Sequence, residues 1–295
     1  MLLAGTASCG PAFVSFSAPC TLAAPTRFLP SEITESSGLV ASRSRPGAFW
    51  THNDGPGDEP LYLIDAGGGL LDSVPLVGAS VQDWEDLAIG GCGPNGETSC
   101  LYLADTGDND ERRDDPTLYR VPEPPPGASE TAPLQRFTVR FPDGPRDVEA
   151  LYLLPGERLF LVTKGRNQPV ELYRVPALPT LAAAPPDVPL MLEHVQTLTS
   201  EAPPLPQWVT GASATPDGRF IAIRTYATLQ FYRPGPGGTV IPLAGGLVNL
   251  SVVGEVQGEA VAFASGTDVV LTSEAGPLGG RGTLATLRCT PEEGR

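Results

Sequence analysis

The fold is decided by the stretch VEALYLLPGERLFLVTKGRN (residues 148–167). It contains two apolar runs on either side of the turn sequence PGE, and the second run ends in the polar residues TKGRN. Apolar runs of this length, bounded by Gly and Pro, predict two antiparallel strands joined by a tight turn. The stretch VTGASATPDGRFIAIRTY (209–226) aligns with it without a gap. These two matching stretches indicate an internal repeat.

Three further segments follow the same plan of a polar head, a short strand, a turn and a second strand that ends in polar residues. They begin with SSGLVAS (36–42), WEDLAIG (84–90) and GEAVAFAS (258–265). Each repeat continues into a third strand, and fourth strands are predicted at 70–78, 134–141, 192–199 and 247–254. Five repeats of four strands predict an all-β, five-bladed β-propeller.

The fifth repeat has no candidate fourth strand after it. We expect CTLAAPTRFLP (20–30) to supply that strand, because circular propellers close when an N-terminal strand completes the last blade. Cys20 would then lie beside Cys289, and we expect these two residues to form a disulfide. Cys92 and Cys100 flank the loop GPNGETS, a spacing that predicts a second disulfide at a hairpin tip.

Two alternatives stay open for this architecture. A β-sandwich could carry the same motifs by coincidence, and the long, Pro-rich stretch 174–191 could hide a degenerate sixth blade. We interpret that stretch as an irregular insertion. We divide the chain into a signal-like or disordered segment (1–19) and a single propeller domain (20–295).

The composition excludes several classes of partner. The 295 residues include 34 Gly and 33 Pro, and 41% are hydrophobic, which is typical of a folded chain with many tight turns. A formal net charge of −15 disfavours nucleic acids and anionic membranes and favours cations. We therefore expect no nucleic-acid partner, and we expect a monomer.

The first residues, MLLAGTASCGPA, are similar to the end of a bacterial lipoprotein signal in which Cys9 carries the lipid. They lack a basic start and the usual Leu three residues before the Cys, so a disordered N-terminus with an incidental Cys stays open. The other four cysteines would form two bridges, which is typical of an oxidising compartment. We therefore expect an extracytoplasmic protein whose membrane contact is a lipid anchor, because no run reaches the roughly 18 apolar residues of a transmembrane helix.

Oxygen-bearing side chains recur at one position in the five repeats. When the repeats are aligned on the first apolar residue of the first strand, the residue two places earlier is Ser37, Glu85, Glu149, Thr210 or Glu259. Strand alternation turns these side chains the same way, and a ring of blades brings them together at the channel axis. Converging carboxylates need a cation, and oxygen ligands favour Ca²⁺ over Zn²⁺. The sequence therefore predicts a calcium ion bound by these five residues, although a solvated turn residue is the alternative for any one of them.

The second strand of each repeat ends in polar residues at the face where the metal is predicted, because in an antiparallel pair the end of the second strand lies beside the start of the first. We expect the following residues to rim the metal: Asn53, Asp54, Asp105, Asp108, Asn109, Lys164, Arg166, Arg224 and Glu274. Cations beside a metal suit a phosphate or carboxylate ligand. The predicted catalytic residues within this set are Asp54, Asp105, Lys164 and Arg224, and a salt bridge at the rim is the alternative for each of the cations.

The order Ser, Glu, Glu, hydroxyl, Glu at the heads of the five inner strands resembles the soluble calcium-activated nucleotidases (apyrases). The motifs SSGLV, WEDLA, VEALY and QGEAVAF carry this resemblance. It implies a five-bladed propeller with one Ca²⁺ in its channel. The motif LYLADTGDN is also similar to bacterial phytase-like propellers and their esterase-like relatives. We therefore expect a calcium-dependent phosphohydrolase that acts on a phosphoanhydride or phosphoester, and the alternative is a non-catalytic ligand- or protein-binding propeller with a structural calcium.

The acidic stretch VQDWEDLAIG (81–90) carries three carboxylates to which we assign three roles. Glu85 joins the predicted ring. Asp86, which alternates to the opposite face, is expected to brace neighbouring backbone, and Trp84 on that face is expected to pack between blades. Asp83 is interpreted as the end of the preceding turn.

Overall fold

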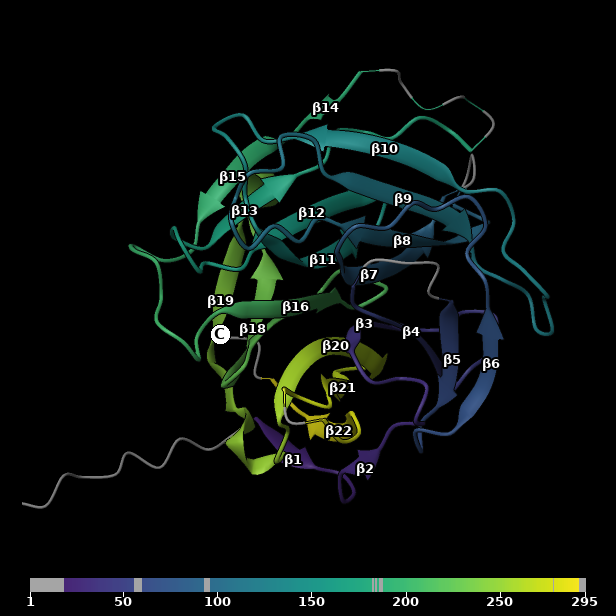
Figure 1. Cartoon of the computed structure of the whole chain (residues 1–295). Helices are drawn as coiled ribbons and strands as arrows, with labels where there is room; N and C mark the ends of the chain where they lie inside the picture. The colour runs from purple at the N-terminus through teal and green to yellow at the C-terminus, as the bar shows by residue number, and fades with distance from the viewer. Residues whose placement is uncertain are drawn as a thin grey trace, which may run out of the picture.

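Five antiparallel sheets surround a common axis in the computed structural model, and each sheet is one blade of a β-propeller (Figure 1). The structure describes residues 19–55, 60–92, 96–181, 183, 185, 188–277 and 279–291. Cys9 and the rest of segment 1–18 lie outside the described residues. The all-β, five-bladed architecture predicted from the repeats is confirmed. In the described part of the chain, no helix is long and apolar enough to cross a membrane.

Each blade consists of strands that follow one another along the chain, with the first strand nearest the axis. Blade 1 contains β3 (Ser36–Ala41), β4 (Ala48–Asn53), β5 (Leu61–Asp65) and β6 (Leu70–Val74). Blade 2 contains β7 (Trp84–Gly91), β8 (Ser99–Asp105), β9 (Thr117–Pro122) and β10 (Gln135–Arg140). Blade 3 contains β11 (Val148–Leu154), β12 (Arg158–Thr163), β13 (Glu171–Arg174) and β15 (Glu193–Thr197). Blade 4 contains β16 (Val209–Ala214), β17 (Ile221–Thr225), β18 (Thr228–Pro234) and β19 (Val240–Asn249).

Blade 5 is closed by the N-terminal part of the propeller. Its inner strands are β20 (Gln257–Ser265), β21 (Asp268–Glu274) and β22 (Thr283–Cys289). The short strands β1 (Cys20–Leu22) and β2 (Arg27–Phe28) both pair with β22, so the predicted outer strand is present as two pieces. Cys20 pairs directly with Cys289 and forms a disulfide with it. The second predicted disulfide, Cys92–Cys100, is also present.

The fourth strand of blade 4 lies earlier than predicted. The expected range was 247–254, whereas β19 ends at Asn249 and is followed by the 3-10 turn Leu250–Val252. Its first half reads VIPLAGG, which suggests a loop because Pro and Gly weaken strands. This strand is the outermost one of its blade and, among the described strands, has no neighbour on one side. Pro242, which lacks an amide hydrogen, is tolerated on such an edge strand.

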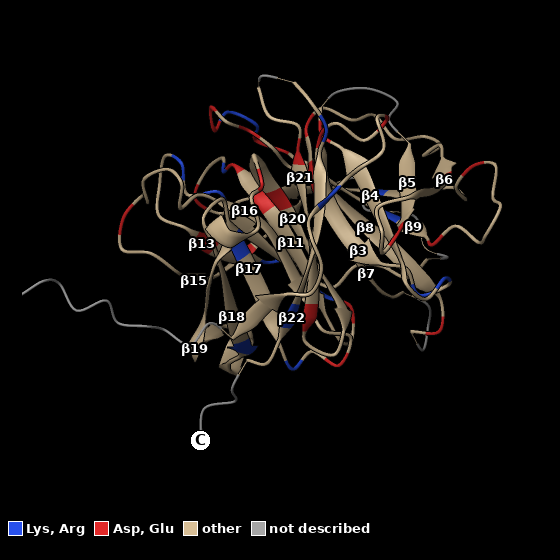
Figure 2. Cartoon of the chain, turned by 90° about the horizontal axis from the view of Figure 1, so that it is seen from below, with Lys and Arg blue, Asp and Glu red and all other residues tan. Residues whose placement is uncertain are grey.

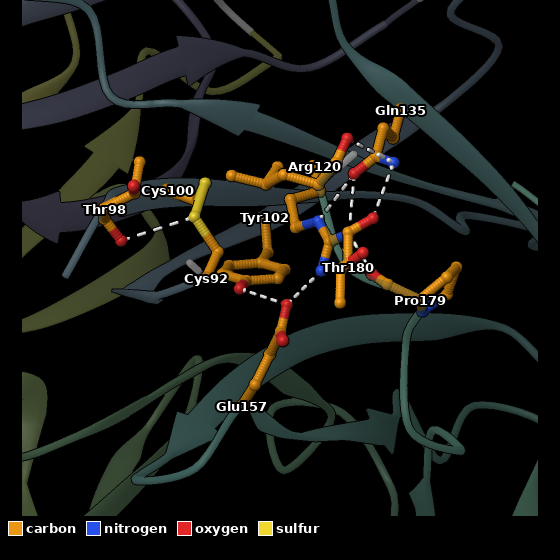
Figure 3. Close-up of a disulfide and its surroundings, with 10 residues drawn as sticks. Cys92, Thr98, Cys100, Tyr102, Arg120, Gln135, Glu157, Pro179 and Thr180 are labelled. Atoms are coloured by element: carbon orange, nitrogen blue, oxygen red, sulfur yellow. Dashed lines mark hydrogen bonds and ion pairs between the residues drawn. A yellow bond between two sulfur atoms is a disulfide. The ribbon is translucent and has the colours of Figure 1, made fainter. Parts of the chain in front are cut away.

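The Pro-rich stretch 174–191 is an insertion, as predicted, and it ends on the neighbouring blade. Its last residues form β14 (Leu190–Met191), which pairs in parallel with β10 of blade 2. Figure 3 shows how the start of the insertion is held. Arg120 is fully buried, contacts the carbonyl oxygen of Pro179 and forms an ion pair with Glu157. Gln135 accepts from Arg120 Nε at 3.0 Å, so the side chains of blade 2 anchor the insertion.

The hydrophobic core is divided among the five contacts between blades. Each of five clusters of buried side chains draws its members from two neighbouring blades. The fifth joins blade 5 to blade 1, where Leu39 and Phe49 lie in one cluster with Ala260 and Val270. Trp84 belongs to the cluster between blades 1 and 2, so it packs between blades as predicted. Burial of apolar surface on both faces of every blade therefore holds the ring closed.

Candidate functional site

Every inner strand has a break in its regular pairing close to its start, and β20 has a second one near its end. The residue at the break is Glu85 in β7, Glu149 in β11, Thr210 in β16 and Glu259 in β20. In β3 the irregular step spans Ser37 and Gly38. A β-bulge contains an unpaired residue and re-aims its side chain. All five residues of the predicted ring therefore lie at the bulge of their own blade. The bulge sets the direction of each side chain, whereas the sequence argument relied on strand alternation alone.

The five bulge residues are buried at one mouth of the channel. None of these residues is more than 4% exposed. The inner strands that carry them contact one another in the closed order β3, β7, β11, β16, β20. In Figure 2, acidic segments (red) gather around β20 and near the end of β21. We call this end of the channel the acidic mouth.

Two groups of three carboxylates form the centre of the acidic mouth. The outer triad consists of Asp54, Asp83 and Glu85, and the inner triad consists of Glu85, Asp147 and Glu149. In each triad, one carboxylate oxygen from each of the three residues lies within 4.8 Å of the other two. All three residues of the inner triad are buried, whereas Asp54 and Asp83 are partly exposed. Glu85 therefore joins a buried group to one that faces solvent.

Two members of these triads were not predicted from the sequence to belong to the site at all. Asp83 was interpreted as a turn residue, and Asp147 was not considered. Each lies two places before a bulge glutamate, so the motif Asp-x-Glu occurs in both DWE (83–85) and DVE (147–149). That repeated spacing is the signal that could have identified them.

The remaining bulge residues surround the inner triad without joining it. The negative charge of Glu259 contributes to the raised pKa of Glu149, which indicates that the two lie close together. Thr210 donates its hydroxyl to the carbonyl oxygen of Gly258 at 3.0 Å. Ser37 is buried at the head of blade 1. The structure thus brings Glu85 and Glu149 together directly, and whether all five bulge residues bind one ion stays a prediction.

Lys164 is the cation of the inner triad. Its Nζ donates to Glu149 Oε1 at 2.6 Å, and its side chain is 10% exposed. Burial alone would lower the pKa of Lys164, but the negative charges of Glu149 and Asp147 raise it above its ordinary value. The lysine therefore remains charged and offsets part of the negative charge in the mouth.

The carboxyl groups of the mouth have raised pKa values. Burial raises the pKa of Glu149 to about 8, an effect that Lys164 opposes and Asp147 increases. Burial also raises the pKa of Glu85 well above its ordinary value, and the negative charges of Glu149 and Asp54 add to the rise. The pKa of Asp54 rises to about 7, again mainly through burial. Without a cation, several of these groups hold protons near neutral pH.

Two of the four predicted catalytic residues, Asp54 and Lys164, lie in the acidic mouth. The other two are engaged in structural contacts. The Asp105 carboxylate accepts from the amide of Asp83 at 2.9 Å and forms an ion pair with Arg113. Arg224 is fully buried, contrary to its predicted place on the rim.

Arg224 joins blade 4 to blade 5. It donates to Glu255 Oε2 at 2.9 Å and to the carbonyl oxygen of Ala260 at 2.9 Å. Sequence position puts this residue at the end of a second strand, but its long side chain lies between the blades. These contacts engage both terminal nitrogens of the guanidinium, so Arg224 has a bracing role, in line with the salt bridge that was the alternative to catalysis.

Other predicted rim residues also have structural partners. Asp108 Oδ2 accepts from the amides of Arg112 and Arg113, and Asn109 accepts from Arg166. Asn53 donates to the carbonyl oxygen of Glu32 at 3.0 Å. These contacts order the loops around the mouth.

Glu274 lies beside a second hollow on this face. Burial raises its pKa to about 7, and the negative charge of Asp54 adds to the rise. A cavity of about 350 Å³ next to it is lined by residues that include Glu35 and Gln257. Tyr226 lies near these carboxylates: burial raises the pKa of its hydroxyl, and the negative charge of Glu259 adds to the rise.

Asp86 forms the floor of the acidic mouth. Its Oδ2 accepts from the amide of Leu151 at 2.8 Å and from the amide of Ala212 at 3.1 Å, and its Oδ1 accepts from the amide of Leu87 at 2.8 Å. The predicted bracing role is therefore confirmed, and it extends to blades 3 and 4. Burial raises the pKa of Asp86 well above its ordinary value, although these three bonds oppose the rise.

The channel is closed at the level of Asp86. The residues of that layer, Leu39, Leu87, Leu151, Ala212 and Val261, are each at most 1% exposed. The carboxylate of Asp86 crosses this layer, because it accepts from the amides of Leu87, Leu151 and Ala212 in three different blades. A cavity of about 720 Å³ beyond this layer is lined by the far ends of the inner strands. The acidic mouth is therefore a blind site that opens to one face of the propeller.

No protein-family model matches this chain, and no curated protein sequence matches it. Solved structures do match it. PQQ-bound aldose sugar dehydrogenase from Streptomyces coelicolor is 14% identical, with a TM-score of 0.50 over 92% of this chain and 99% of that chain. This chain and that structure share a propeller fold. At this identity the likeness shows the fold alone, and no residue role passes from that enzyme to this chain.

Two further structures have lower scores. Soluble aldose sugar dehydrogenase from Escherichia coli, in its apo form, is 13% identical, with a TM-score of 0.47 over 90% of this chain and 99% of that chain. A Bacteroides thetaiotaomicron protein of unknown function is 11% identical, with a TM-score of 0.46 over 89% of this chain and 72% of that chain. The nucleotidase resemblance depends on its sequence motifs.

Proposed function

We propose that this protein is a calcium-binding β-propeller whose ion is held by the inner triad, Glu85, Asp147 and Glu149. One observation carries the proposal. Asp147 Oδ2 is buried in this triad, and none of the described residues is its hydrogen-bond partner. A buried carboxylate oxygen without a partner is costly, and a cation would remove that cost.

The chemistry of the donors favours calcium. The triad offers carboxylate oxygens and neither a histidine nor a cysteine. Hard cations such as Ca²⁺ prefer such oxygens, and Ca²⁺ accepts six to eight of them in flexible geometry. The other bulge residues, Ser37, Thr210 and Glu259, remain the predicted additional ligands.

We further propose that the calcium form is a phosphohydrolase. A bound Ca²⁺ supplies a Lewis acid that polarises a phosphoryl group. Lys164 would stabilise the negative charge of a phosphorylated ligand, and the partly exposed Asp54 would orient an attacking water. Support for this activity comes from the open side of the outer triad and from the motifs shared with nucleotidases and phytase-like propellers.

A panel assay tests the proposed activity. Purified protein is offered a nucleoside triphosphate, phytate and an aryl phosphate, each with calcium or with EGTA. We expect calcium-dependent release of phosphate from at least one of them, and a marked loss of that release in the Asp54→Asn variant, because the attacking water would no longer be oriented. No turnover on the whole panel would exclude the phosphohydrolase.

The second candidate function is a non-catalytic binding propeller with a structural calcium. The contact between Lys164 and Glu149 favours it, because the one lysine of the mouth already has a buried partner. The same panel should include aryl esters, and aldoses with PQQ and an electron acceptor, because the Streptomyces coelicolor neighbour is an aldose sugar dehydrogenase. Calcium binding without turnover of any substrate would support this candidate.

We also propose an extracytoplasmic location. Both pairs of described cysteines that the sequence predicted form disulfides, and disulfides persist in oxidising compartments. The lipid anchor at Cys9 remains a separate prediction. Fractionation of cells that express the full chain, with Cys9→Ser as the control variant, tests both: the variant should lose membrane association and keep its disulfides.

A further inference from the structure

Glu85 is the residue from which a further site can be inferred. Its side chain is 4% exposed, and it belongs to both the outer and the inner triad. Among the described residues, no group forms a hydrogen bond or an ion pair with its carboxylate. A carboxylate buried to this extent without a partner points to ligands that are missing on both sides of it.

We propose that the acidic mouth binds two divalent cations that share Glu85, one in the inner triad and one in the outer triad. The inference rests on the proposed calcium function and adds the second ion to it. The two ions would be bridged by one carboxylate, as in two-metal sites in which the ions lie roughly 3.5–4 Å apart. The triads share this residue and extend to different partners, Asp147 and Glu149 on one side and Asp54 and Asp83 on the other.

The charge of the mouth supports two ions over one. The two triads contain five carboxylates, and Lys164 is the cation in contact with them. Within these six groups, five negative charges and one positive charge leave −4 when all are ionised, and the nearby carboxylate of Glu259 adds one more negative charge. Two divalent cations offset most of that charge, whereas a single ion would leave at least −2 in a largely buried site. Uncompensated charge of this size is strongly unfavourable at low dielectric.

Gly107 provides the space that the shared carboxylate needs. A Cβ at this position would lie 2.0 Å from Glu85 Oε1 and 2.5 Å from Asp83 Oδ2. The loop DTGDN therefore approaches the outer triad closely with backbone and without a side chain. A larger residue at position 107 would displace both carboxylates and disrupt the outer triad.

The two ions would differ in their access to solvent. All three residues of the inner triad are buried, so an ion bound there would be shielded from solvent and would have a structural role. The outer triad contains two partly exposed carboxylates, so an ion there keeps coordination positions for water or for a phosphoryl oxygen. The outer ion is thus the one that would contact a substrate.

Equilibrium dialysis against calcium chloride, with bound metal measured by atomic absorption, tests the second ion. We expect two equivalents in the wild type, one in Asp54→Asn, one in Asp147→Asn and none in Glu85→Gln. Glu193→Gln is the matched control, because Glu193 lies on β15 at the rim of blade 3 and is 58% exposed on its side chain. It should bind two equivalents.

The outcomes separate this inference from the proposed function. One equivalent in the wild type, which Asp54→Asn leaves in place, would overturn the outer ion and keep the calcium protein. No bound calcium in the wild type would overturn both. A circular-dichroism melt of each variant shows that it is folded. Gly107→Ala supplies a second test that removes no ligand: it should lose one equivalent, and retention of two would contradict the shared site.

Discussion

Asp86 of blade 2 accepts a hydrogen bond from the backbone amide of Ala212 of blade 4, at 3.1 Å. The same oxygen also accepts from the amide of Leu151 in the blade between them. One buried carboxylate thus ties together three of the five inner strands below the acidic mouth. The position of the bulges above it depends on this tie.

Removal of this carboxylate should destabilise the propeller strongly. Asp86→Ala would leave three buried amides without acceptors, and at about 1–3 kcal/mol for each we expect a loss of at least about 3 kcal/mol in the free energy of unfolding. Urea denaturation followed by tryptophan fluorescence measures it. Asp65→Ala is the matched control, because Asp65 also accepts from two amides, those of Gly67 and Gly69, but in an exposed turn. A similar loss in both variants would contradict the tie.

The stability of the metal-free protein should fall as the pH rises. Burial raises the pKa of Glu149 and of Glu259 from the ordinary 4.5 to about 8. These groups bind protons more tightly in the folded state, so their stabilising effect is complete below about pH 4.5 and is lost as the pH passes through about 8. Thermal melts in EGTA between pH 5 and 8.5 check this. Calcium should reduce the fall, and a melting temperature in EGTA that rises across this range would contradict the assignment.

The lysine of the mouth should compete with the metal. Lys164→Met removes a positive charge that contacts Glu149, so we expect calcium to bind more tightly by about tenfold, which corresponds to about 1.4 kcal/mol. Phosphate release should fall in the same variant, because the ligand's negative charge loses its partner. Weaker calcium binding would show that Lys164 orients the carboxylates and does not compete with the ion.

The ring closure should depend on one disulfide more than on the other. The Cys20–Cys289 bridge spans 269 residues, and the Cys92–Cys100 bridge spans 8. The chain-entropy account assigns the longer loop the larger effect, so the double variant Cys20→Ser, Cys289→Ser should lose about 2–5 kcal/mol. Guanidinium unfolding of this variant and of the Cys92→Ser, Cys100→Ser control measures the difference. An equal loss in both would show that closure of the ring contributes little.

The sequence was sufficient for the positions that repeat. Glu85, Glu149 and Glu259 could be aligned because their blades share a pattern of strands and turns. The Cys20–Cys289 disulfide followed from closure of the repeat, and Cys92–Cys100 followed from the spacing across one loop. The bulges could not be predicted, because a bulge is defined by its pairing with the neighbouring strand and leaves no mark in the chain itself. Strand alternation pointed to the same residues that the structure places at the bulges, although by a different geometry.

The partners of individual side chains were less predictable. Asp105 and Arg224 occupy the expected strand ends, but whether such a residue faces the mouth or braces a neighbour depends on contacts between blades that are distant in the sequence. Asp83 was assigned to a turn because its position just before a strand suits one. Its approach to Asp54 arises from the packing of blade 1 against blade 2.

The most direct test of the account is an isothermal calcium titration of EGTA-stripped wild type and of Glu85→Gln. Glutamine is close in shape to the protonated Glu85 that burial favours, so the variant should fold without metal. We expect saturable calcium binding in the wild type and none in Glu85→Gln, with an unchanged melting temperature in EGTA. Equal calcium affinity in the two proteins would contradict the claim that the bulge carboxylates form a metal site.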